Sequence, residues 1–331
     1  MPEGTTQPPG LDPAKSPGLD PAKFKDPHLT ARGEARAHVA LAALETLWLN
    51  TGSLCNITCD HCYMDSSPKN DRLAYLTLAE AEAFFDEIQA TGLPTAEIGL
   101  TGGEPFMNRE TIAIIESALG RGFRVLVLTN AMKPLWNKRD RLLAMRGRLG
   151  AGVTDENLTL RVSIDHHTAA RHEHLRGPDT WAPMMRGLKW LAGEGFRINV
   201  AGRTCWDEDE AAERAAYAGL FAREGLALDA ANPAELVLFP EMDAARDVPE
   251  ITTGCWSILN VRPDAMMCAT SRMVVRRKGD RGPRVVPCTL LPYDAAFDMG
   301  TTLQDAAGDV SLNHPHCAAF CVLGGASCSA G

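Results

Sequence analysis

The sequence predicts an α/β protein in which a parallel sheet is followed by a small cysteine-rich C-terminal region. Short aliphatic runs alternate about six times with helical stretches, a pattern typical of right-handed βαβ units around a parallel sheet. The alternation stops near residue 245, and six of the ten cysteines follow that point. Helical pattern is sparse among them, so we expect a second, small domain that is stabilised by metal.

The expected strands are the aliphatic runs at residues 44–50, 95–100, 123–130, 158–165, 196–204 and 234–240. The clearest helices between them lie at residues 77–92, 108–122 and 181–195. The first of these helices opens with Thr77 and Glu80 at the spacing of a capping box, and it ends at Gly92. Six such repeats are compatible with an open doubly wound sheet or with a partial barrel.

Composition and charge exclude several classes of protein. The chain has 331 residues, 45% of them hydrophobic, and a net charge of -9, so no global attraction to nucleic acid or to an anionic membrane is expected. No apolar run approaches the ~20 residues that span a bilayer, and the N-terminus lacks the features of a signal peptide. We therefore expect a cytoplasmic protein, in which clustered cysteines are metal ligands or catalysts more often than disulfides.

Three regions are expected along the chain. Residues 1–36 contain a short tandem repeat, PGLDPAKS followed by PGLDPAKF, that is rich in proline, glycine and charge. Such a composition is typical of a disordered tail. Residues 37–245 contain the alternating strands and helices, and residues 246–331 form the cysteine-rich domain.

Three cysteines follow the first expected strand at the spacing C-x3-C-x2-C: Cys55, Cys59 and Cys62. A structural zinc site needs four ligands, and His61 inside the loop could supply the fourth. Alternatively, three thiolates can hold a [4Fe-4S] cluster and leave one iron free for a substrate or cofactor. The second interpretation agrees better with the place of the loop, because parallel α/β folds bind ligands at the carboxyl ends of their strands.

This loop, with His61 at the position of an aromatic residue, resembles the signature of radical S-adenosylmethionine (SAM) enzymes. A second motif of that family is GGEP, which falls just after the second expected strand as Gly102, Gly103, Glu104 and Pro105. The resemblance covers about residues 44–240 and implies a partial (β/α)6 barrel of the TIM type. It also implies that SAM is the missing fourth ligand of the cluster.

The resemblance further implies roles for polar residues near the strand ends. The GGEP backbone and Glu104 would contact the SAM amino group, and His61 would lie beside the cofactor. Polar groups would hold the SAM ribose and carboxylate at the matching positions Asn130, Ser163 and Arg176. A reduced [4Fe-4S] cluster would then cleave SAM to a 5′-deoxyadenosyl radical that abstracts hydrogen from a substrate.

The C-terminal cysteines resemble the auxiliary-cluster extension called SPASM or, when shortened, twitch. Both the spacing from Cys268 through Gly282 to Cys288 and the spacing of the last three cysteines depart from the usual pattern. We therefore expect one auxiliary [4Fe-4S] cluster with a redox role, and a zinc knuckle is the alternative. The candidate ligands, of which Cys288, Cys317 and Cys321 are the best placed, are Cys255, Cys268, Cys288, Cys317, Cys321 and Cys328.

The expected function is therefore that of a radical SAM enzyme with an auxiliary cluster, acting on a small molecule or on a peptide or protein. Its expected partners are this substrate and an electron donor such as flavodoxin or ferredoxin, and neither nucleic acid nor membrane. The alternative is a non-catalytic iron–sulfur or zinc sensor, against which GGEP argues, since a sensor needs no contact with the SAM amine. Four histidines after the fourth strand, at 166, 167, 172 and 174, are expected in a polar loop and the start of a helix, with proton transfer or substrate contact as the alternative.

Overall fold

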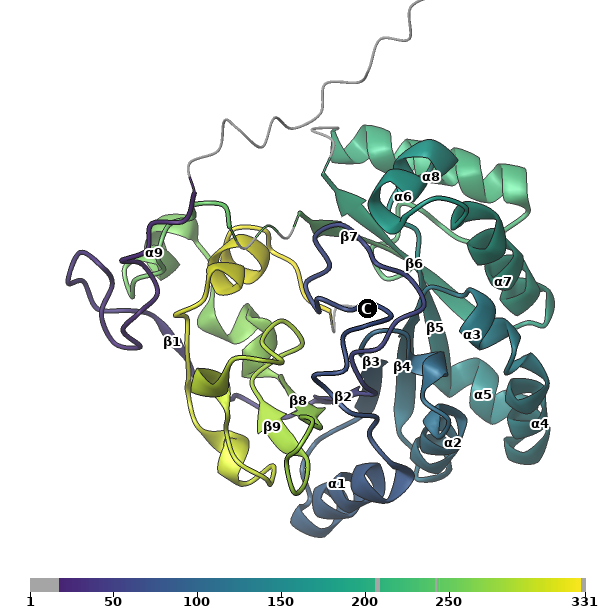
Figure 1. Cartoon of the computed structure of the whole chain (residues 1–331), viewed down its shortest axis with the longest axis horizontal. Helices are drawn as coiled ribbons and strands as arrows, with labels where there is room; N and C mark the ends of the chain where they lie inside the picture. The colour runs from purple at the N-terminus through teal and green to yellow at the C-terminus, as the bar shows by residue number, and fades with distance from the viewer. Residues whose placement is uncertain (1–17, 206–208, 242, 244, 329–331) are drawn as a thin grey trace, which may run out of the picture.

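The computed structural model describes residues 18–205, 209–241, 243 and 245–328. Its centre is an eight-stranded sheet with the strand order β7-β6-β5-β4-β3-β2-β8-β9 (Figure 1). Neighbouring strands are parallel from β7 to β8, and the last pair, β8 and β9, is antiparallel. The strands are β2 (Thr46–Asn50), β3 (Glu97–Thr101), β4 (Arg124–Thr129), β5 (Leu158–Ser163), β6 (Arg197–Thr204), β7 (Leu236–Pro240), β8 (Ser271–Val275) and β9 (Arg284–Val286). A separate small ladder pairs β1 (His38–Val39) with β10 (Val310–Ser311).

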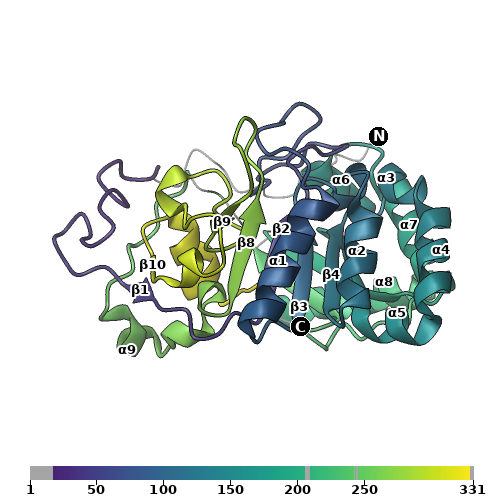
Figure 2. The same cartoon turned by 90° about the horizontal axis from the view of Figure 1, so that it is seen from below.

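The helices of the alternating region cover the outer side of this sheet, as Figures 1 and 2 show. They are α1 (Leu78–Thr91), α2 (Thr111–Gly120), α3 (Lys133–Trp136), α4 (Arg139–Leu149), α5 (Ala151–Asn157), α6 (Ala169–Arg176), α7 (Trp181–Gly193) and α8 (Glu210–Glu224). Within the described ranges, no helix is long and apolar enough to cross a membrane. The predicted order of six parallel strands with helices between them is confirmed.

Local sequence explains where the elements begin and end. At α1, the Thr77 hydroxyl accepts from the Glu80 backbone N–H, while the Glu80 carboxylate accepts from the Thr77 backbone N–H at 3.0 Å, so the predicted capping box is present. The helix ends at Gly92, whose φ of 65° is a left-handed conformation that glycine adopts without strain. The central strands are almost completely buried, as expected for a parallel sheet covered on both faces.

The two faces of the sheet bury two hydrophobic cores, and β2 contributes to both. Leu47 and Leu49 pack into the core beneath the helices, whereas Trp48 packs into the core of the C-terminal region. Trp48 lies over Gly99 of β3, where an added Cβ would come within 2.3 Å of the indole ring. The alternation of side chains along a strand thus joins the two regions through one sheet.

The C-terminal region extends this sheet instead of forming one of its own. Strand β8 pairs with β2 in parallel register, and its hairpin partner β9 forms the edge. The rest of the region consists of α9 (Cys255–Leu259), short 3-10 helices and a π-helix at Cys317–Val322. The sparse helical pattern of the sequence agrees with these short elements, and the boundary at residue 245 remains a prediction.

The N-terminal segment differs in part from the expectation of a disordered tail over residues 1–36. Residues 1–17 lie outside the described residues, but the following segment is held against residues 245–252. Arg36 forms a buried ion pair with Glu250, and Lys23 donates a 2.7 Å hydrogen bond to Asp247. The Phe24 backbone N–H also donates to Glu250. These charged residues have partners far away in the chain, which local composition does not reveal.

Candidate functional site

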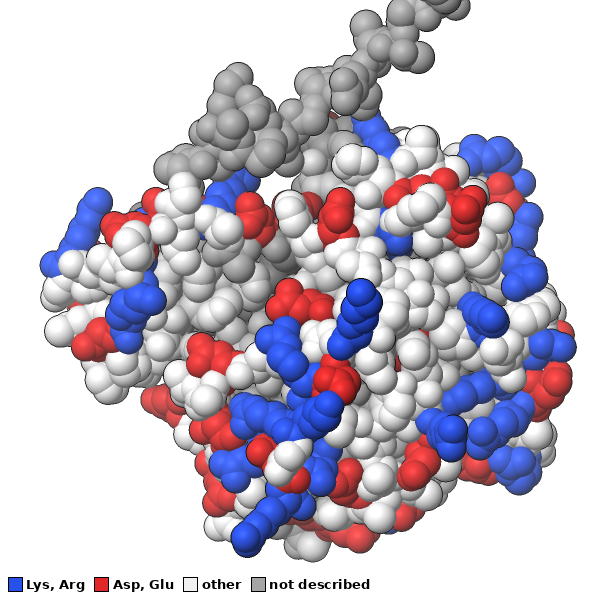
Figure 3. Space-filling view, viewed as in Figure 1, with Lys and Arg blue, Asp and Glu red and all other residues white. Residues whose placement is uncertain are grey.

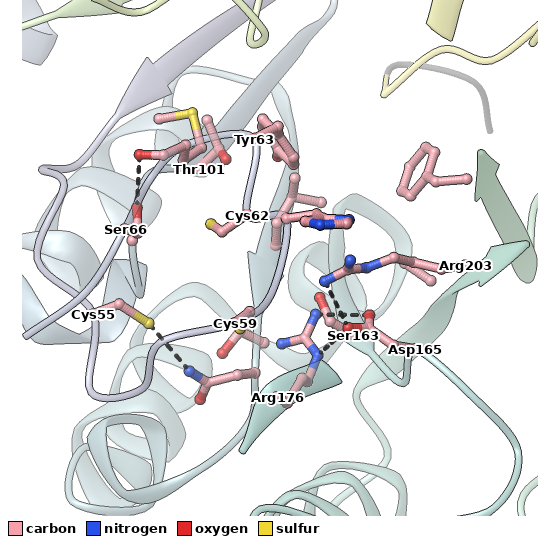
Figure 4. Close-up of a pocket in the computed structure, with 18 of the residues that line it drawn as sticks. Cys55, Cys59, Cys62, Tyr63, Ser66, Thr101, Ser163, Asp165, Arg176 and Arg203 are labelled. Atoms are coloured by element: carbon pink, nitrogen blue, oxygen red, sulfur yellow. Dashed lines mark hydrogen bonds and ion pairs between the residues drawn. The ribbon is translucent and has the colours of Figure 1, made fainter. Parts of the chain in front are cut away.

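The three cysteines of the C-x3-C-x2-C loop line one cavity of about 140 Å³ at the carboxyl ends of the strands. The loop connects β2 to α1, and Figure 4 shows Cys55, Cys59 and Cys62 around a common space. All three are free thiols. The structure therefore brings together the three metal ligands that the sequence predicts.

Backbone hydrogen bonds fix the shape of this loop. The Cys55 N–H donates to the Ser67 carbonyl at 3.1 Å, and the Asp65 N–H donates to the Cys62 carbonyl at 2.8 Å. A third bond, from the Asp60 N–H to the Leu175 carbonyl at 2.7 Å, ties the loop to α6. The thiols are thus positioned by the backbone and need no regular secondary structure.

The surroundings of Cys55 and Cys59 disfavour a free, unbound thiolate. Burial, together with the charge of Glu104, raises the pKa of Cys55 to about 12. Burial also raises the pKa of Cys59, although the nearby Arg176 lowers it. A thiol of this kind stays protonated at neutral pH unless a metal centre replaces the proton. Together with Cys62 on the same loop, these two thiols fit the open iron–sulfur cluster that the sequence predicts.

Gly102 and Gly103 pack the GGEP segment directly against the cysteine loop. A Cβ at Gly103 would lie 2.1 Å from the Leu54 carbonyl oxygen, and one at Gly102 would lie 2.5 Å from that of Gly52. The Gly103 N–H donates to the Gly52 carbonyl at 2.8 Å. Both glycines also line the cavity. Glycine is therefore needed at both positions because two backbone segments pass close to each other there. The sequence had predicted only that the GGEP backbone contacts a ligand.

Glu104 is engaged by the protein itself. Its carboxylate accepts hydrogen bonds from the Thr129 hydroxyl at 2.9 Å, from the Asn130 N–H at 2.8 Å and from the Phe106 N–H at 3.1 Å. Burial raises the pKa of Glu104, and these hydrogen bonds oppose the rise. The side chain, 2% exposed, ties the GGEP segment to the end of β4. Neither Glu104 nor Pro105, the first residue of the 3-10 helix Pro105–Met107, is among the residues that line the cavity.

Arg176 reaches the cavity, but it is paired with a carboxylate of the chain. It donates two hydrogen bonds to Asp165, at 2.8 and 2.9 Å, and Arg203 lies 3.1 Å from the same carboxylate (Figure 4). Burial would raise the pKa of Asp165, but the two guanidinium groups outweigh it and lower the pKa to about 2. The predicted pairing of Arg176 with a cofactor carboxylate must therefore compete with this buried ion pair.

The other predicted cofactor residues also line the cavity. The Asn130 side chain donates to the Asn56 Oδ1 at 2.9 Å, and its Nδ2 lies 3.8 Å from the Cys55 sulfur. Ser163 lies at the end of β5. His61 is half-exposed at the rim, and its Nδ1 is in hydrogen-bond contact with the Glu241 carboxylate. Polar groups from three neighbouring strand ends thus meet beside the cysteine loop.

Sequence reasoning missed an apolar wall of the cavity, to which the cysteine loop, β7 and the C-terminal region all contribute. The wall consists of Tyr63, Phe239, Phe320 and Cys328. The rings of Phe239 and Phe320 lie 5.5 Å apart and join β7 to the C-terminal region. The only available signal was the position of Phe239 at the end of the sixth strand, since Phe320 and Cys328 come from a part of the chain with no periodic pattern.

The four histidines of residues 166–174 do not line this cavity. His172 is fully buried and packs edge-on against Trp181 at 5.4 Å. Burial, with the nearby Arg176, lowers the pKa of His172 to about 3. His166 is buried as well, and its Nδ1 accepts from the Thr168 N–H at 3.0 Å. The expected helix is present as α6, but at least His166 and His172 are interior groups, which a polar loop does not predict.

The six C-terminal cysteines separate into three groups. Four of them surround a small closed space and are buried: Cys268, Cys288, Cys317 and Cys321. Burial raises the pKa of Cys288, and the neighbouring Cys321 and Cys268 raise it further. Cys328 lies between this group and the cavity and accepts from the Thr289 hydroxyl at 3.3 Å. Cys255 lies apart, beside Thr252 at the start of α9.

Among the described residues, no three His, Cys, Asp or Glu side chains converge closely enough to hold a single metal ion. Thiolates that hold an iron–sulfur cluster bind different irons, so they need not converge on one point. A parallel α/β sheet with three clustered thiols at the carboxyl ends of its strands is typical of proteins that bind a metal-containing cofactor at that edge of the sheet.

The family comparison agrees with this class. The profile of the Radical SAM superfamily matches residues 49–233, and the chain belongs to that superfamily. Its members are enzymes that use a [4Fe-4S] cluster and SAM. The predicted family, fold and cofactors are therefore confirmed, and nothing in the comparisons supports the non-catalytic sensor.

Two curated relatives are each similar to 44% of the chain. It is 28% identical over 150 residues to an AdoMet-dependent heme synthase of Oleidesulfovibrio alaskensis, covering 44% of this chain and 35% of the relative. It is 26% identical over 148 residues to the subtilosin biosynthesis protein AlbA of Bacillus subtilis, covering 44% and 30%. The chain thus spans about a third of the length of these relatives.

Solved structures share the fold over a larger part of the chain. The AdoMet-bound structure of anSMEcpe has a TM-score of 0.54 at 13% identity and covers 81% of both chains. Streptococcus suis SuiB bound to S-adenosylmethionine has a TM-score of 0.53 at 10% identity and covers 78% of this chain and 63% of SuiB. At such identities the likeness concerns the fold alone.

Proposed function

We propose that this protein reductively cleaves SAM at a cluster held by Cys55, Cys59 and Cys62 and uses the resulting radical on a substrate in the adjoining cavity. The observation that carries the proposal is that all three thiols line the cavity that the strand-end polar residues also line. When bound there, the cluster and SAM supply an electron and a 5′-deoxyadenosyl radical able to abstract hydrogen.

The chain's own residues hold and orient the cofactor. Gly102, Gly103, Asn130 and Ser163 present backbone and polar side-chain groups toward the cavity. Glu104 contributes indirectly, because its hydrogen bonds hold the Asn130 backbone and the GGEP turn in place. We assign Arg176 a positioning role as well, since its guanidinium is fixed by Asp165.

The apolar wall is the proposed place of the substrate. Tyr63, Phe239 and Phe320 exclude water from the space in which a carbon radical would form. A groove continues outward from Cys59 and Cys62 along Tyr293. A small molecule would occupy the cavity, and a peptide would also lie in this groove, as SuiB has been solved with its precursor peptide SuiA.

We propose a second metal site at Cys268, Cys288, Cys317 and Cys321, where a single auxiliary [4Fe-4S] cluster would bind. The four thiols are buried together, and Cys328 lies on the side that faces the cavity. An auxiliary cluster at this position would adjoin the substrate wall through Phe320. We assign neither Cys255 nor Cys328 to this cluster.

The test of the proposed activity is release of 5′-deoxyadenosine by the anaerobically reconstituted protein with SAM and dithionite. Wild-type protein should release it, and the Cys59→Ala protein should not. The matched control is Cys205→Ala, which removes a buried cysteine that does not line the cavity. Equal release by wild type and Cys59→Ala would reject the proposed site.

A further inference from the structure

One basic surface of this acidic protein has few acidic partners. Residues 133–141, KPLWNKRDR, contain four basic residues and one acidic residue, although the whole chain has a net charge of -9. Arg186 of α7 adds a fifth cation to them through Trp136. We call the group Lys133, Lys138, Arg139, Arg141 and Arg186 the α3–α4 basic surface.

The cations of this surface are held close together. The guanidinium carbons of Arg139 and Arg186 lie 4.9 and 4.4 Å from the ring centroid of Trp136, so two positive groups stack on one indole. Burial, together with the neighbouring Arg141, lowers the pKa of Lys138 to about 8. Asp140 lies 3.7 Å from Arg139 and is itself strongly exposed, so its carboxylate offsets little of the positive charge of this surface.

A second basic region on the same face is balanced by acids. Lys and Arg gather over the hairpin of β8 and β9, where acidic side chains lie among them (Figure 3). Arg276 pairs with Glu80, Arg72 pairs with Asp65, and Lys278 pairs with Asp71. The basic run RMVVRRKGDRGPR, which could predict either an attraction for acidic partners or an exposed hairpin tip, therefore exerts a weaker field than its composition suggests.

The α3–α4 basic surface begins where the cysteine loop contacts the barrel. Asn130 lies 3.8 Å from the Cys55 sulfur, and the Asn56 side chain lies 3.9 Å from the Met132 sulfur. The next residue, Lys133, begins α3. Figure 2 shows α3 at the same end of the molecule as the cysteine loop. Two residues that touch the loop thus connect it directly to the basic surface.

We infer that this surface docks the acidic redox protein that reduces the cluster. The inference rests on the proposed function, because it assumes a cluster at Cys55, Cys59 and Cys62. Complementary charge would bring an acidic electron donor to the side of the loop on which Cys55 lies, and such attraction acts mainly on the rate of association. In this step the donor loses one electron, the cluster gains it, and no bond is formed or broken.

The test compares two reductants on the holoenzyme. In the Arg141→Glu/Arg186→Glu protein, 5′-deoxyadenosine formation driven by reduced flavodoxin at low salt should fall by about tenfold or more. Formation driven by dithionite, which needs no protein docking, should stay within about twofold of wild type. The matched control is Arg32→Glu/Arg281→Glu, which makes the same charge change at exposed positions outside both the cysteine loop and the α3–α4 basic surface and should leave both rates unchanged.

The outcomes separate the docking inference from the proposed function. No 5′-deoxyadenosine from wild type with dithionite would reject the proposed function itself. With dithionite active, an unchanged flavodoxin rate in the Arg141/Arg186 variant, or an equal loss in the Arg32/Arg281 control, would overturn the docking surface. Binding of a short RNA that is lost in the Arg141/Arg186 variant, with flavodoxin kinetics unchanged, would assign the surface to nucleic acid and also overturn the inference.

Discussion

Arg176 donates two hydrogen bonds to Asp165 at the edge of the cavity, and this pair ties the end of β5 to the end of α6. Arg203, from β6, approaches the same carboxylate at 3.1 Å. The carboxylate is 4% exposed, so it is nearly removed from water between two cations. The positions of two arginines in the barrel mouth therefore depend on one aspartate.

The first prediction concerns this aspartate. Asp165→Asn leaves two buried guanidinium groups without their counter-charge, and the free energy of unfolding should fall by about 3–5 kcal/mol. Urea unfolding of wild type and variant measures this difference. Asp140→Asn, at an exposed ion pair on α4, is the matched control and should change stability by less than about 1 kcal/mol. Equal stability of the Asp165→Asn protein and wild type would contradict a structural role for the pair.

The second prediction concerns how the stability difference between wild type and Asp165→Asn depends on pH. The pKa of Asp165 is lowered from 3.8 to about 2, so the folded protein binds this proton less readily than the unfolded chain does. The stability contributed by the carboxylate is then fully present above about pH 4–5 and is lost as the pH falls towards 2. The stability gap between wild type and Asp165→Asn should therefore be constant from pH 7 to 5 and narrow below pH 4. A gap that widens on acidification would contradict this assignment.

The third prediction concerns Glu104. Glu104→Gln replaces a carboxylate that accepts three hydrogen bonds with a group that cannot accept all of them. The metal-free protein, without SAM, should lose about 1–3 kcal/mol of stability. Glu116→Gln, on the surface of α2, is the control and should cost less than about 1 kcal/mol. A Glu104→Gln protein with wild-type stability but weaker SAM binding would restore the ligand role that the sequence predicted.

The fourth prediction concerns the close packing at Gly103. Gly103→Ala places a methyl group 2.1 Å from the Leu54 carbonyl oxygen, so the cysteine loop must shift. Overpacking of this kind should cost about 1–3 kcal/mol and reduce the iron bound by the loop. Gly219→Ala, on an exposed turn of α8 with free space around it, should instead stabilise the protein by about 0.5–1 kcal/mol. Iron content and unfolding curves of the two variants measure the contrast.

The sequence predicted much of the fold because its signals are local. Alternating apolar runs, the capping pair Thr77 and Glu80, and Gly92 each act within a few residues, and all are found as expected. The cysteine loop could also be predicted, because its three candidate ligands lie within eight residues. Family resemblance added the partial barrel, which periodicity alone did not distinguish from an open sheet.

The parts that the sequence did not reveal depend on contacts between distant residues. The hydrogen bonds from the Asn130 N–H to Glu104 and from Arg176 to Asp165 were not predicted, because each joins residues that are not neighbours in the sequence. The segment before residue 36 is held by Glu250, more than 200 residues away. Similarly, the spacing of the cysteines could not show which of Cys255, Cys268 and Cys328 belongs with Cys288, Cys317 and Cys321. In the structure, only Cys268 of these three lines the same small space as that group.

The central claim is that two separate sets of cysteines hold two clusters and that only the first set cleaves SAM. It is tested by iron content and 5′-deoxyadenosine release in anaerobically reconstituted wild type, in Cys55/Cys59/Cys62→Ala, and in Cys268/Cys288/Cys317/Cys321→Ala. Wild type should bind about eight irons per chain, as two clusters of four. Each variant should retain about four irons, and the four-cysteine variant should still form 5′-deoxyadenosine whereas the three-cysteine variant should not. Formation of 5′-deoxyadenosine by the three-cysteine variant would contradict the claim, as would an iron content near eight in the four-cysteine variant.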